Sequence, residues 1–306
     1  MNGIINVYKE KGFTSHDVVA KLRGILHMKK IGHTGTLDPD AVGVLPVCIG
    51  KGTGLVSLIT DWTKTYEAVM LLGKTTDTQD ISGSVLTESE VNVDERTILE
   101  VCSQFEGEYD QIPPMYSALK VNGKKLYELA RAGVEVERKP RHVVINSLRV
   151  NDINLNEDVK TVTITVDCSK GTYIRTLCED IGKKLGCGAC MMSLKRTRVG
   201  EFIIDDTLTL NQIAALTLKG EIQDYIINID EMFPDYRKIT IDQEYNKLLY
   251  NGNKLPAWAV AEDKYEFLDM EKFRIYDFNG DFIGIYKYVA GQFVLEKMFY
   301  ESNTHN

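Results

Sequence analysis

The stretch GHTGTLDPDAVGVLP, residues 32–46, holds the carboxylate Asp38 in a turn rich in glycine and proline. Pro39 fixes its own φ and pushes Asp38 toward an extended conformation. Three glycines allow positive φ and close backbone approach: Gly32, Gly35 and Gly43. A single acid on a narrow, rigid loop suits a group that must meet a substrate at one angle. The same residue types also suit an ordinary Asp-Pro turn beside a core strand.

The composition of the chain sets broad limits on its class. It has 306 residues, 43% of them hydrophobic, enough for one large domain or a large and a small one. The net charge of -8 gives no global sign of nucleic-acid binding, so any such contact must come from local basic patches. The N-terminus lacks a signal peptide, and no apolar run is long enough to span a membrane. We therefore expect a cytoplasmic protein.

The six scattered cysteines do not have the spacing of a disulfide framework or a zinc site. Apolar periodicity and capping residues predict alternating strands and helices along most of the chain. The expected strands are 4–8, 44–49, 66–72 and 159–168, and the expected helices are 17–28, 94–105, 172–185 and 207–218. A polar turn cluster, TTDTQDISG, occupies residues 75–83.

After residue 235 the pattern changes to short strands. Asn279-Gly280 is a type I′ hairpin signal between 273–278 and 282–288, and Gly291 marks a further turn before 293–299. The sequence therefore predicts a small β domain over 236–306, following a first domain over 1–235.

Two further sequence segments contain side chains that can take part in binding or catalysis. In CSKGTYIRT, residues 168–176, Arg175 lies where a strand passes into a helix and can pair with a carboxylate or phosphate. In KTYEAVMLL, residues 64–72, Tyr66 offers a flat face for a base and a hydroxyl for proton transfer. Taken singly, each also fits an ordinary surface arginine or strand tyrosine.

Residues 111–149 have a different composition from the rest of the chain. They contain eight Lys or Arg against three Glu, a local excess of five positive charges. Glycines at 123 and 133 break the segment into a flexible insertion, which suits RNA capture better than a solvated helical face.

Together, these motifs closely resemble those of the TruB-type tRNA pseudouridine synthases. The order and spacing of the three strings above match, as do QIPPMYSALKVNGKKLY at 111–127 and GKKLGCGACMMSLKRTRVG at 182–200. The resemblance covers roughly residues 3–235 and implies an α+β fold, with a mixed, mainly antiparallel sheet flanked by helices. It extends weakly to the tail, where it implies a small PUA-like β domain. One departure is Glu10, since the family usually has Lys-Pro where this chain has Lys9-Glu10.

The resemblance also implies roles for individual residues. Asp38 matches the catalytic aspartate, Tyr66 the tyrosine that stacks on the target base, and Arg175 the arginine that pairs with the aspartate. We expect the Arg175 charge to keep the pKa of Asp38 low. Residues implied to contact the substrate uridine or line its pocket are His33, Tyr173, Leu194, Lys9 and Lys64. Those expected to bind RNA phosphates, in an insertion over about 111–140, are Lys120, Lys124, Lys125 and Arg131.

The implied reaction turns uridine 55 in the T-loop of tRNA into pseudouridine. The base must be flipped out of its loop, its N-glycosidic bond breaks, and C5 joins the ribose. No cofactor or metal is expected, nor any obligatory protein partner, so we expect a monomer that binds the tRNA T-arm. The sequence leaves open whether Asp38 attacks C1′ of ribose, attacks C6 of uracil, or removes a ribose proton.

Three alternatives compete with this interpretation. The first is an RNA-binding module or tRNA folding chaperone without chemistry, which would have no use for a buried Asp–Arg pair. The second is a pseudouridine synthase for another RNA, such as ribosomal RNA, whose aspartate motif looks different. The third is a hydrolase that uses Asp38 with Asp40, for which no matching second site is seen.

Overall fold

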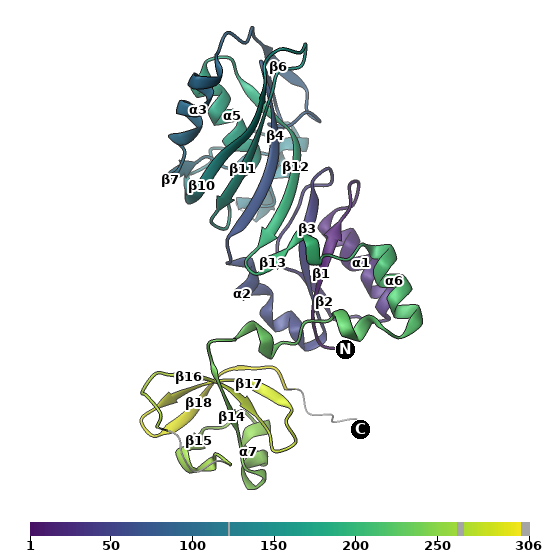
Figure 1. The fold of residues 1–306 in the computed structure, drawn as a ribbon, viewed down its shortest axis with the longest axis vertical. Coiled ribbons are helices and arrows are strands. Elements are labelled where there is room, and N and C mark those ends of the chain that lie inside the picture. The colour runs from purple at the N-terminus through teal and green to yellow at the C-terminus, as the bar shows by residue number, and fades with distance from the viewer. Residues whose placement is uncertain (122, 262–265, 301–306) are drawn as a thin grey trace.

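The structure, a computed structural model, describes residues 1–121, 123–261 and 266–300. A large mixed sheet with flanking helices is followed by a separate, smaller sheet (Figure 1). The strands of the large sheet follow the order β1-β3-β12-β4-β11-β10-β7, with β2 and β13 paired to β3 and β12. They are β1 (Gly3–Lys9), β2 (Ile31–His33), β3 (Val42–Ile49), β4 (Lys64–Leu72), β7 (Gly107–Gln111), β10 (Arg141–Asn154), β11 (Thr161–Cys168), β12 (Ala189–Val199) and β13 (Phe202–Ile203).

One strand pair of the large sheet is parallel, and this pair lies beside residues 34–41, which form the Asp38 loop. Strands β3 and β12 run parallel through Val42 and Gly43, which pair with Lys195 and Arg196. The other pairs of the large sheet are antiparallel. The prediction of a mixed, mainly antiparallel sheet flanked by helices is therefore confirmed.

Helices α3 (Glu95–Ser103) and α5 (Ile174–Leu185) cover one half of the sheet. Buried and half-buried residues alternate along the whole length of β4, as expected for a strand with one face in a core. The Asp94 side chain caps α3 by accepting from the Thr97 amide, and Gly186 ends α5 in a left-handed conformation. Helix α5 begins two residues later than the sequence pattern suggested, which places Arg175 in its first turn.

The other half of the sheet is covered by α1 (Ser15–Leu26) and α6 (Leu210–Lys219). Thr14 caps α1 in a reciprocal pair with Asp17, so the chain enters this helix at a defined angle. The opposite face of β1 and β3 contacts α2 (Val56–Thr60) and the C-terminal β domain. None of the helices in the described ranges is long and apolar enough to cross a membrane.

The basic insertion between β7 and β10 forms a small exposed unit. It contains β8 (Lys120–Val121), β9 (Lys124–Lys125) and α4 (Leu126–Arg131). A second hairpin, β5 (Lys74–Thr76) with β6 (Val85–Glu88), follows β4, and the polar turn cluster lies at its tip. Both units border a cavity of about 630 Å³ beside the start of α5.

The second sheet has the order β14-β16-β17-β18-β15 and its own apolar core. Its elements are β14 (Arg237–Thr240), α7 (Asn246–Tyr250), β15 (Leu255–Pro256), β16 (Lys272–Tyr276), β17 (Phe282–Val289) and β18 (Gln292–Met298). Figure 1 shows it below the large sheet, at the yellow end of the chain. A separate C-terminal β domain was predicted, and the second sheet confirms it.

The type I′ turn predicted at Asn279-Gly280 is wrong. Only Gly280 has positive φ there, because the Asp277 side chain accepts from the amides of Asn279 and Asp281 and holds a bulged turn. Consecutive positive φ angles occur instead at Ala290 and Gly291, between β17 and β18. Of the three glycines within residues 32–46, Gly43 has positive φ, whereas Gly32 and Gly35 do not.

Candidate active site

The Asp38 loop, residues 34–41, is held at both ends by short polar contacts. The Thr34 hydroxyl donates to the Pro46 carbonyl at 3.0 Å, and the Leu37 amide donates to Ser15 Oγ at 2.9 Å. The Gly12 amide donates to the Pro39 carbonyl at 2.9 Å. The loop is therefore tied to β3, to the start of α1 and to the turn after β1, which fixes the direction of the Asp38 side chain.

Lys9 lies beneath this loop, and its side chain is fully buried. Its ammonium group donates to the carbonyls of Ala41 at 2.6 Å, Pro39 at 3.1 Å and Glu10 at 3.2 Å. Burial lowers the pKa of Lys9 to about 8, although the Asp38 charge opposes this shift. The three donors of its ammonium group therefore face the loop backbone, and the binding of substrate by Lys9 stays a prediction.

Lys64 has a comparable position at the start of β4. It is buried, and its ammonium donates to the carbonyls of Trp62 at 2.5 Å and Thr60 at 2.7 Å. Burial lowers its pKa to about 8. Lys64 therefore holds the chain that enters β4, and the binding of substrate by Lys64 stays a prediction.

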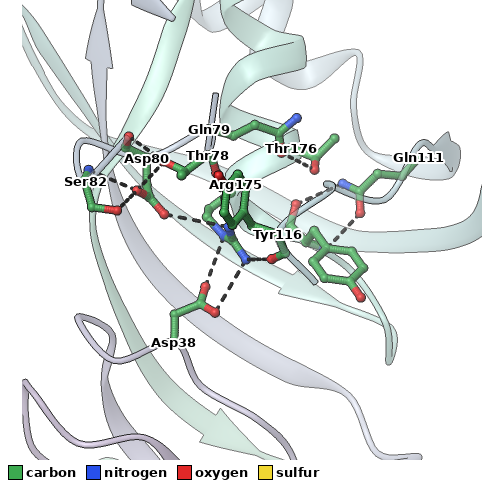
Figure 2. Close-up of polar contacts among 10 residues, drawn as sticks. Asp38, Thr78, Gln79, Asp80, Ser82, Gln111, Tyr116, Arg175 and Thr176 are labelled. Atoms are coloured by element: carbon green, nitrogen blue, oxygen red, sulfur yellow. Dashed lines mark hydrogen bonds and ion pairs between the residues drawn. The ribbon is translucent and has the colours of Figure 1, made fainter. Parts of the chain in front are cut away.

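Arg175 joins Asp38 to two other segments of the chain (Figure 2). Its Nε lies 3.0 Å from Asp38 Oδ2 and its Nη2 lies 3.4 Å from Oδ1, so the guanidinium meets the carboxylate edge to edge. Its Nη1 donates to the Thr78 carbonyl at 3.1 Å and lies 3.7 Å from Asp80 Oδ2. Its Nη2 also donates to the Tyr116 carbonyl at 2.9 Å. The predicted Asp38–Arg175 pair is present.

The environment of Asp38 differs from the expectation in one respect. Burial raises the pKa of Asp38, and the Asp80 charge adds to the rise, whereas Arg175 and Lys9 oppose it. The prediction that Arg175 keeps this pKa low is therefore wrong, because desolvation outweighs the ion pair. The Asp38 side chain is nevertheless 41% exposed, against 8% for Arg175, so the carboxylate has one open face.

Apolar residues on both sides of Asp38 in the sequence belong to a buried core cluster. Tyr66 on β4 and Leu194 on β12 are buried in the same cluster as Leu37 and Ala41, which flank Asp38 in the loop. The structure thus brings Tyr66 and Leu194 to the Asp38 loop from two neighbouring strands. A planar apolar group bound beside Asp38 would replace its contacts with water by contacts with these side chains.

Tyr173 is placed by a pair of hydrogen bonds that the sequence did not reveal. Gln111 accepts from the Tyr173 amide at 2.7 Å and donates to its carbonyl at 3.0 Å. Burial raises the pKa of the Tyr173 hydroxyl, and the charges of Arg141 and Arg175 oppose the rise. Gln111, the last residue of β7, therefore ties the start of the insertion to the residue that precedes α5.

His33, at the end of β2, is held in its neutral form. Burial lowers its pKa to about 4, and the charges of His16 and Arg196 add to this effect. The two histidine rings meet edge to face, with centroids 5.0 Å apart. The His33 Nδ1 atom is buried and has no hydrogen-bond partner in the described part of the chain. A neutral ring can stack on or fill a gap between bases without the cost of desolvating a charge.

The four predicted RNA-binding residues lie in the insertion, and the side chains of Lys120, Lys124 and Arg131 are exposed. Lys125 and Arg131 both lie over the Tyr127 ring, at 5.3 Å and 5.5 Å from its centroid. These two cations are therefore arranged around an aromatic face rather than scattered over a helix.

Sequence reasoning missed several residues of this site. Asp80 holds Arg175 and itself accepts from Thr78 Oγ1 at 2.8 Å and from the Ser82 amide at 3.0 Å. These residues belong to the polar cluster 75–83, which looked like an ordinary turn. Arg196 was present in the string SLKRT but passed unnoticed beside Leu194. The signal for Asp80 was an acid in a turn, which is too common to single out.

Family models match almost the whole of the first 233 residues. The TruB family pseudouridylate synthase N-terminal domain matches residues 23–174, and the tRNA pseudouridylate synthase B C-terminal domain matches residues 175–233. The second match ends just before the second sheet.

Curated relatives match nearly the full length. The chain is 51% identical to tRNA pseudouridine synthase B of Lachnoclostridium phytofermentans, over 94% of this chain and 95% of that protein. It is 43% identical to the protein of that name in Clostridium perfringens strain 13, over 98% of this chain and 100% of that protein.

Solved structures agree with this assignment. A Cbf5-Nop10-Gar1 complex contains a chain with a TM-score of 0.69 and 28% identity, over 97% of this chain and 85% of that chain. An H/ACA RNP bound to a substrate RNA containing 2'-deoxyuridine contains one with a TM-score of 0.68 and 26% identity, over 98% of this chain and 86% of that chain. With its Asp–Arg pair set beside a buried tyrosine and leucine, the chain belongs to the TruB family of pseudouridylate synthases.

Proposed function

We propose that this chain converts uridine 55 in the T-loop of tRNA into pseudouridine, with Asp38 as the catalytic carboxylate. The observation that supports it most directly is the Asp38–Arg175 pair, in a loop whose Leu37 and Ala41 share a buried cluster with Tyr66 and Leu194. The names of the curated relatives support tRNA as the substrate.

The roles of the site residues follow from their chemistry. Asp38 must be ionised to act as a nucleophile or a base, and Arg175 both opposes the effect of burial on its pKa and fixes its orientation. Tyr66 and Leu194 would hold the uracil after its N-glycosidic bond breaks, so that it turns in place and re-forms a bond through C5. The product contains the same atoms as the substrate, so the isomerisation requires no electron or group donor.

Access to the base requires that it leave its loop. Flipping a base costs a few kcal/mol of unstacking. In this proposal, the neutral ring of His33 occupies the space left by uridine, and Tyr173 lines the pocket. The exposed lysines of the insertion, with Lys125 and Arg131 around Tyr127, bind phosphates of the T-arm.

The remaining expectations belong to the same proposal. We infer that residues 1–235 act as the catalytic domain and that the tail from 236 is a PUA-like domain. We also infer a monomeric enzyme of the cytoplasm without an obligatory protein partner. Sedimentation of the purified chain at micromolar concentration measures the oligomeric state, and a dimer would contradict this part of the proposal.

Site mapping in RNA tests the proposed substrate. We expect the chain to modify a full-length tRNA transcript and an isolated T-arm hairpin at the same uridine. A transcript with cytidine in place of uridine 55 serves as the matched control and should remain unmodified. Modification at another position, or of ribosomal RNA alone, would contradict the proposal, and tight binding without modification would favour the chaperone alternative.

A further inference from the structure

Arg196, on β12, is the largest of the fully buried side chains, with 1% exposure. A guanidinium keeps its charge in any protein environment, so its burial is costly unless its N–H groups have acceptors. Its Nε donates to the Val44 carbonyl at 2.7 Å, and its Nη2 donates to the Gly35 carbonyl at 3.3 Å. Neither acceptor is a carboxylate, so this charge serves something other than an ion pair.

The two acceptors lie on opposite sides of Asp38 in the sequence. Gly35 precedes it at the start of the loop, and Val44 follows it in β3. The backbone between them also packs tightly on Arg196. A Cβ added to Gly43 would come within 2.2 Å of the Arg196 carbonyl oxygen, and one added to Gly35 would lie 3.4 Å from its Nη1. One arginine thus fixes both ends of the segment that presents the carboxylate.

The same guanidinium acts on Tyr66. Strand β4 pairs with β12 so that Tyr66 stands directly opposite Arg196. Burial raises the pKa of Tyr66, whereas the Arg196 charge opposes the rise. The Arg196 charge also contributes to the lowered pKa of Lys9, His33 and Lys64.

We propose that Arg196 is a positioning residue that sets the Tyr66 hydroxyl at a fixed place relative to the Asp38 carboxylate. The inference rests on the proposed function and adds a part to it. The planar fork of arginine spreads its N–H groups over three nitrogens, whereas a lysine ammonium presents all its donors from one atom. A fixed separation matters because Asp38 and Tyr66 would act on the same small ring, and a misplacement of about 1 Å can cost a hundredfold in rate.

Single-turnover kinetics test this role through the conservative variant Arg196→Lys. We expect this variant to form pseudouridine on the order of 100-fold more slowly, with a tRNA dissociation constant within about twofold of the parent value. Arg198→Lys is the matched control, since Arg198 lies two residues away on β12 and pairs with Asp167. It should retain the parent rate. Equal rates for Arg196→Lys and the parent would overturn the proposal.

A double variant separates positioning from general support of the fold. Tyr66→Phe removes the hydroxyl that Arg196 is proposed to place, so adding Arg196→Lys to it should slow the reaction much less than Arg196→Lys does alone. Rate losses that multiply in the double variant would show that Arg196 does not act through Tyr66.

A measurement without RNA keeps the inference distinguishable from the proposed function. A fluorinated tyrosine placed at position 66 has a phenol that titrates at lower pH than tyrosine, and its ¹⁹F resonance reports the titration. Loss of the Arg196 guanidinium opposite Tyr66 in Arg196→Lys should move the midpoint to higher pH. An unchanged midpoint would overturn the link, whereas absence of pseudouridine formation by the parent chain would refute only the proposed function.

Discussion

At the scale of the residue, the proposed chemistry depends on the protonation state of one carboxyl group. Asp38 is pushed toward its neutral form by burial and by Asp80, and toward its charged form by Arg175 and Lys9. Asp80 therefore acts in two opposite ways, since it also holds the Arg175 guanidinium 3.7 Å away. Removal of Asp80 separates these effects. Loss of the contact with Arg175 should lower the rate, and loss of the negative charge should shift the pH dependence of the rate.

The first prediction concerns the acid side of the pH–rate profile. Because the pKa of Asp38 is raised, activity should fall on acidification at a higher pH than for an ordinary aspartate. Asp80→Asn removes a negative charge that contributes to this rise, so the fall should move to lower pH. The plateau rate should drop as well, because Arg175 loses a partner.

Single-turnover rates between pH 4 and 8 provide the measurement. The exposed carboxylate Asp61, which pairs with Lys170, supplies the control variant Asp61→Asn, whose profile should match the parent. A shift of the Asp80→Asn profile to higher pH would show that Asp38 is not the group that titrates.

At the scale of the element, the Asp38 loop depends on the contact between β3 and β12. Gly43 is the residue where this parallel pair is closest, because it has φ of +107° and leaves no room for a Cβ against the Arg196 carbonyl. A second element, the basic insertion, reaches the site through Gln111 and Tyr116. The two elements lead to separate predictions, one on stability and one on RNA binding.

Gly43→Ala should destabilise the chain by more than about 1 kcal/mol and also reduce pseudouridine formation. The added methyl group clashes with the β12 backbone, and alanine disfavours the positive φ. Gly24→Ala is the matched control: Gly24 lies in α1 with open space around it, so alanine should be neutral or stabilising there. Urea unfolding and a rate assay on both variants test this, and equal stability would contradict it.

The insertion should act mainly through charge. Lys120→Ala combined with Lys124→Ala should weaken tRNA binding and reduce the slope of log affinity against log salt by about 0.7–0.9 for each phosphate that is no longer neutralised. Lys219→Ala with Lys254→Ala removes the same charge from exposed sites outside the insertion and serves as the control. If both pairs change the slope equally, the insertion makes no specific phosphate contacts.

These elements also show what the sequence could and could not predict. Local patterns were enough for α1, α3, α5 and α6 and for β1, β3, β4 and β11, because caps such as Asp94 and the alternation in β4 act over a few residues. They did not predict the long strands β10 and β12. Asp80 and Arg196 escaped notice because their partners lie far away in the sequence. The turn at Asn279-Gly280 was misassigned because the Asp277 side chain changed a two-residue loop into a bulge.

At the scale of the whole molecule, the burial of two lysines should make the free energy of unfolding depend on pH. Buried Lys64 and Lys9 each have a pKa lowered to about 8 from 10.5. Between these two pH values the unfolded chain holds a proton that the folded chain has released. Unfolding then takes up protons, so the free energy of unfolding should rise with pH in this window.

Removal of one lysine should reduce this rise. Lys64→Met should lower the slope between pH 8 and pH 9.5 by at most about 1.4 kcal/mol per pH unit. Lys11→Met, a change at an exposed lysine, should leave the slope as it is. Urea unfolding at pH 7.5, 8.5 and 9.5 gives the comparison, and identical slopes for the parent and Lys64→Met would refute the assignment of this titration to Lys64.

Asp38 is the group proposed to make this chain a pseudouridine synthase acting on tRNA. The decisive test is the release of tritium from C5-labelled uridine in a tRNA transcript, because hydrogen leaves C5 only when that carbon bonds to ribose. We predict release by the unsubstituted chain and none by Asp38→Asn, with tRNA binding retained in both. Release by Asp38→Asn at the parent rate would contradict the proposed role of Asp38, and tight binding by the parent chain without release would contradict the proposed activity.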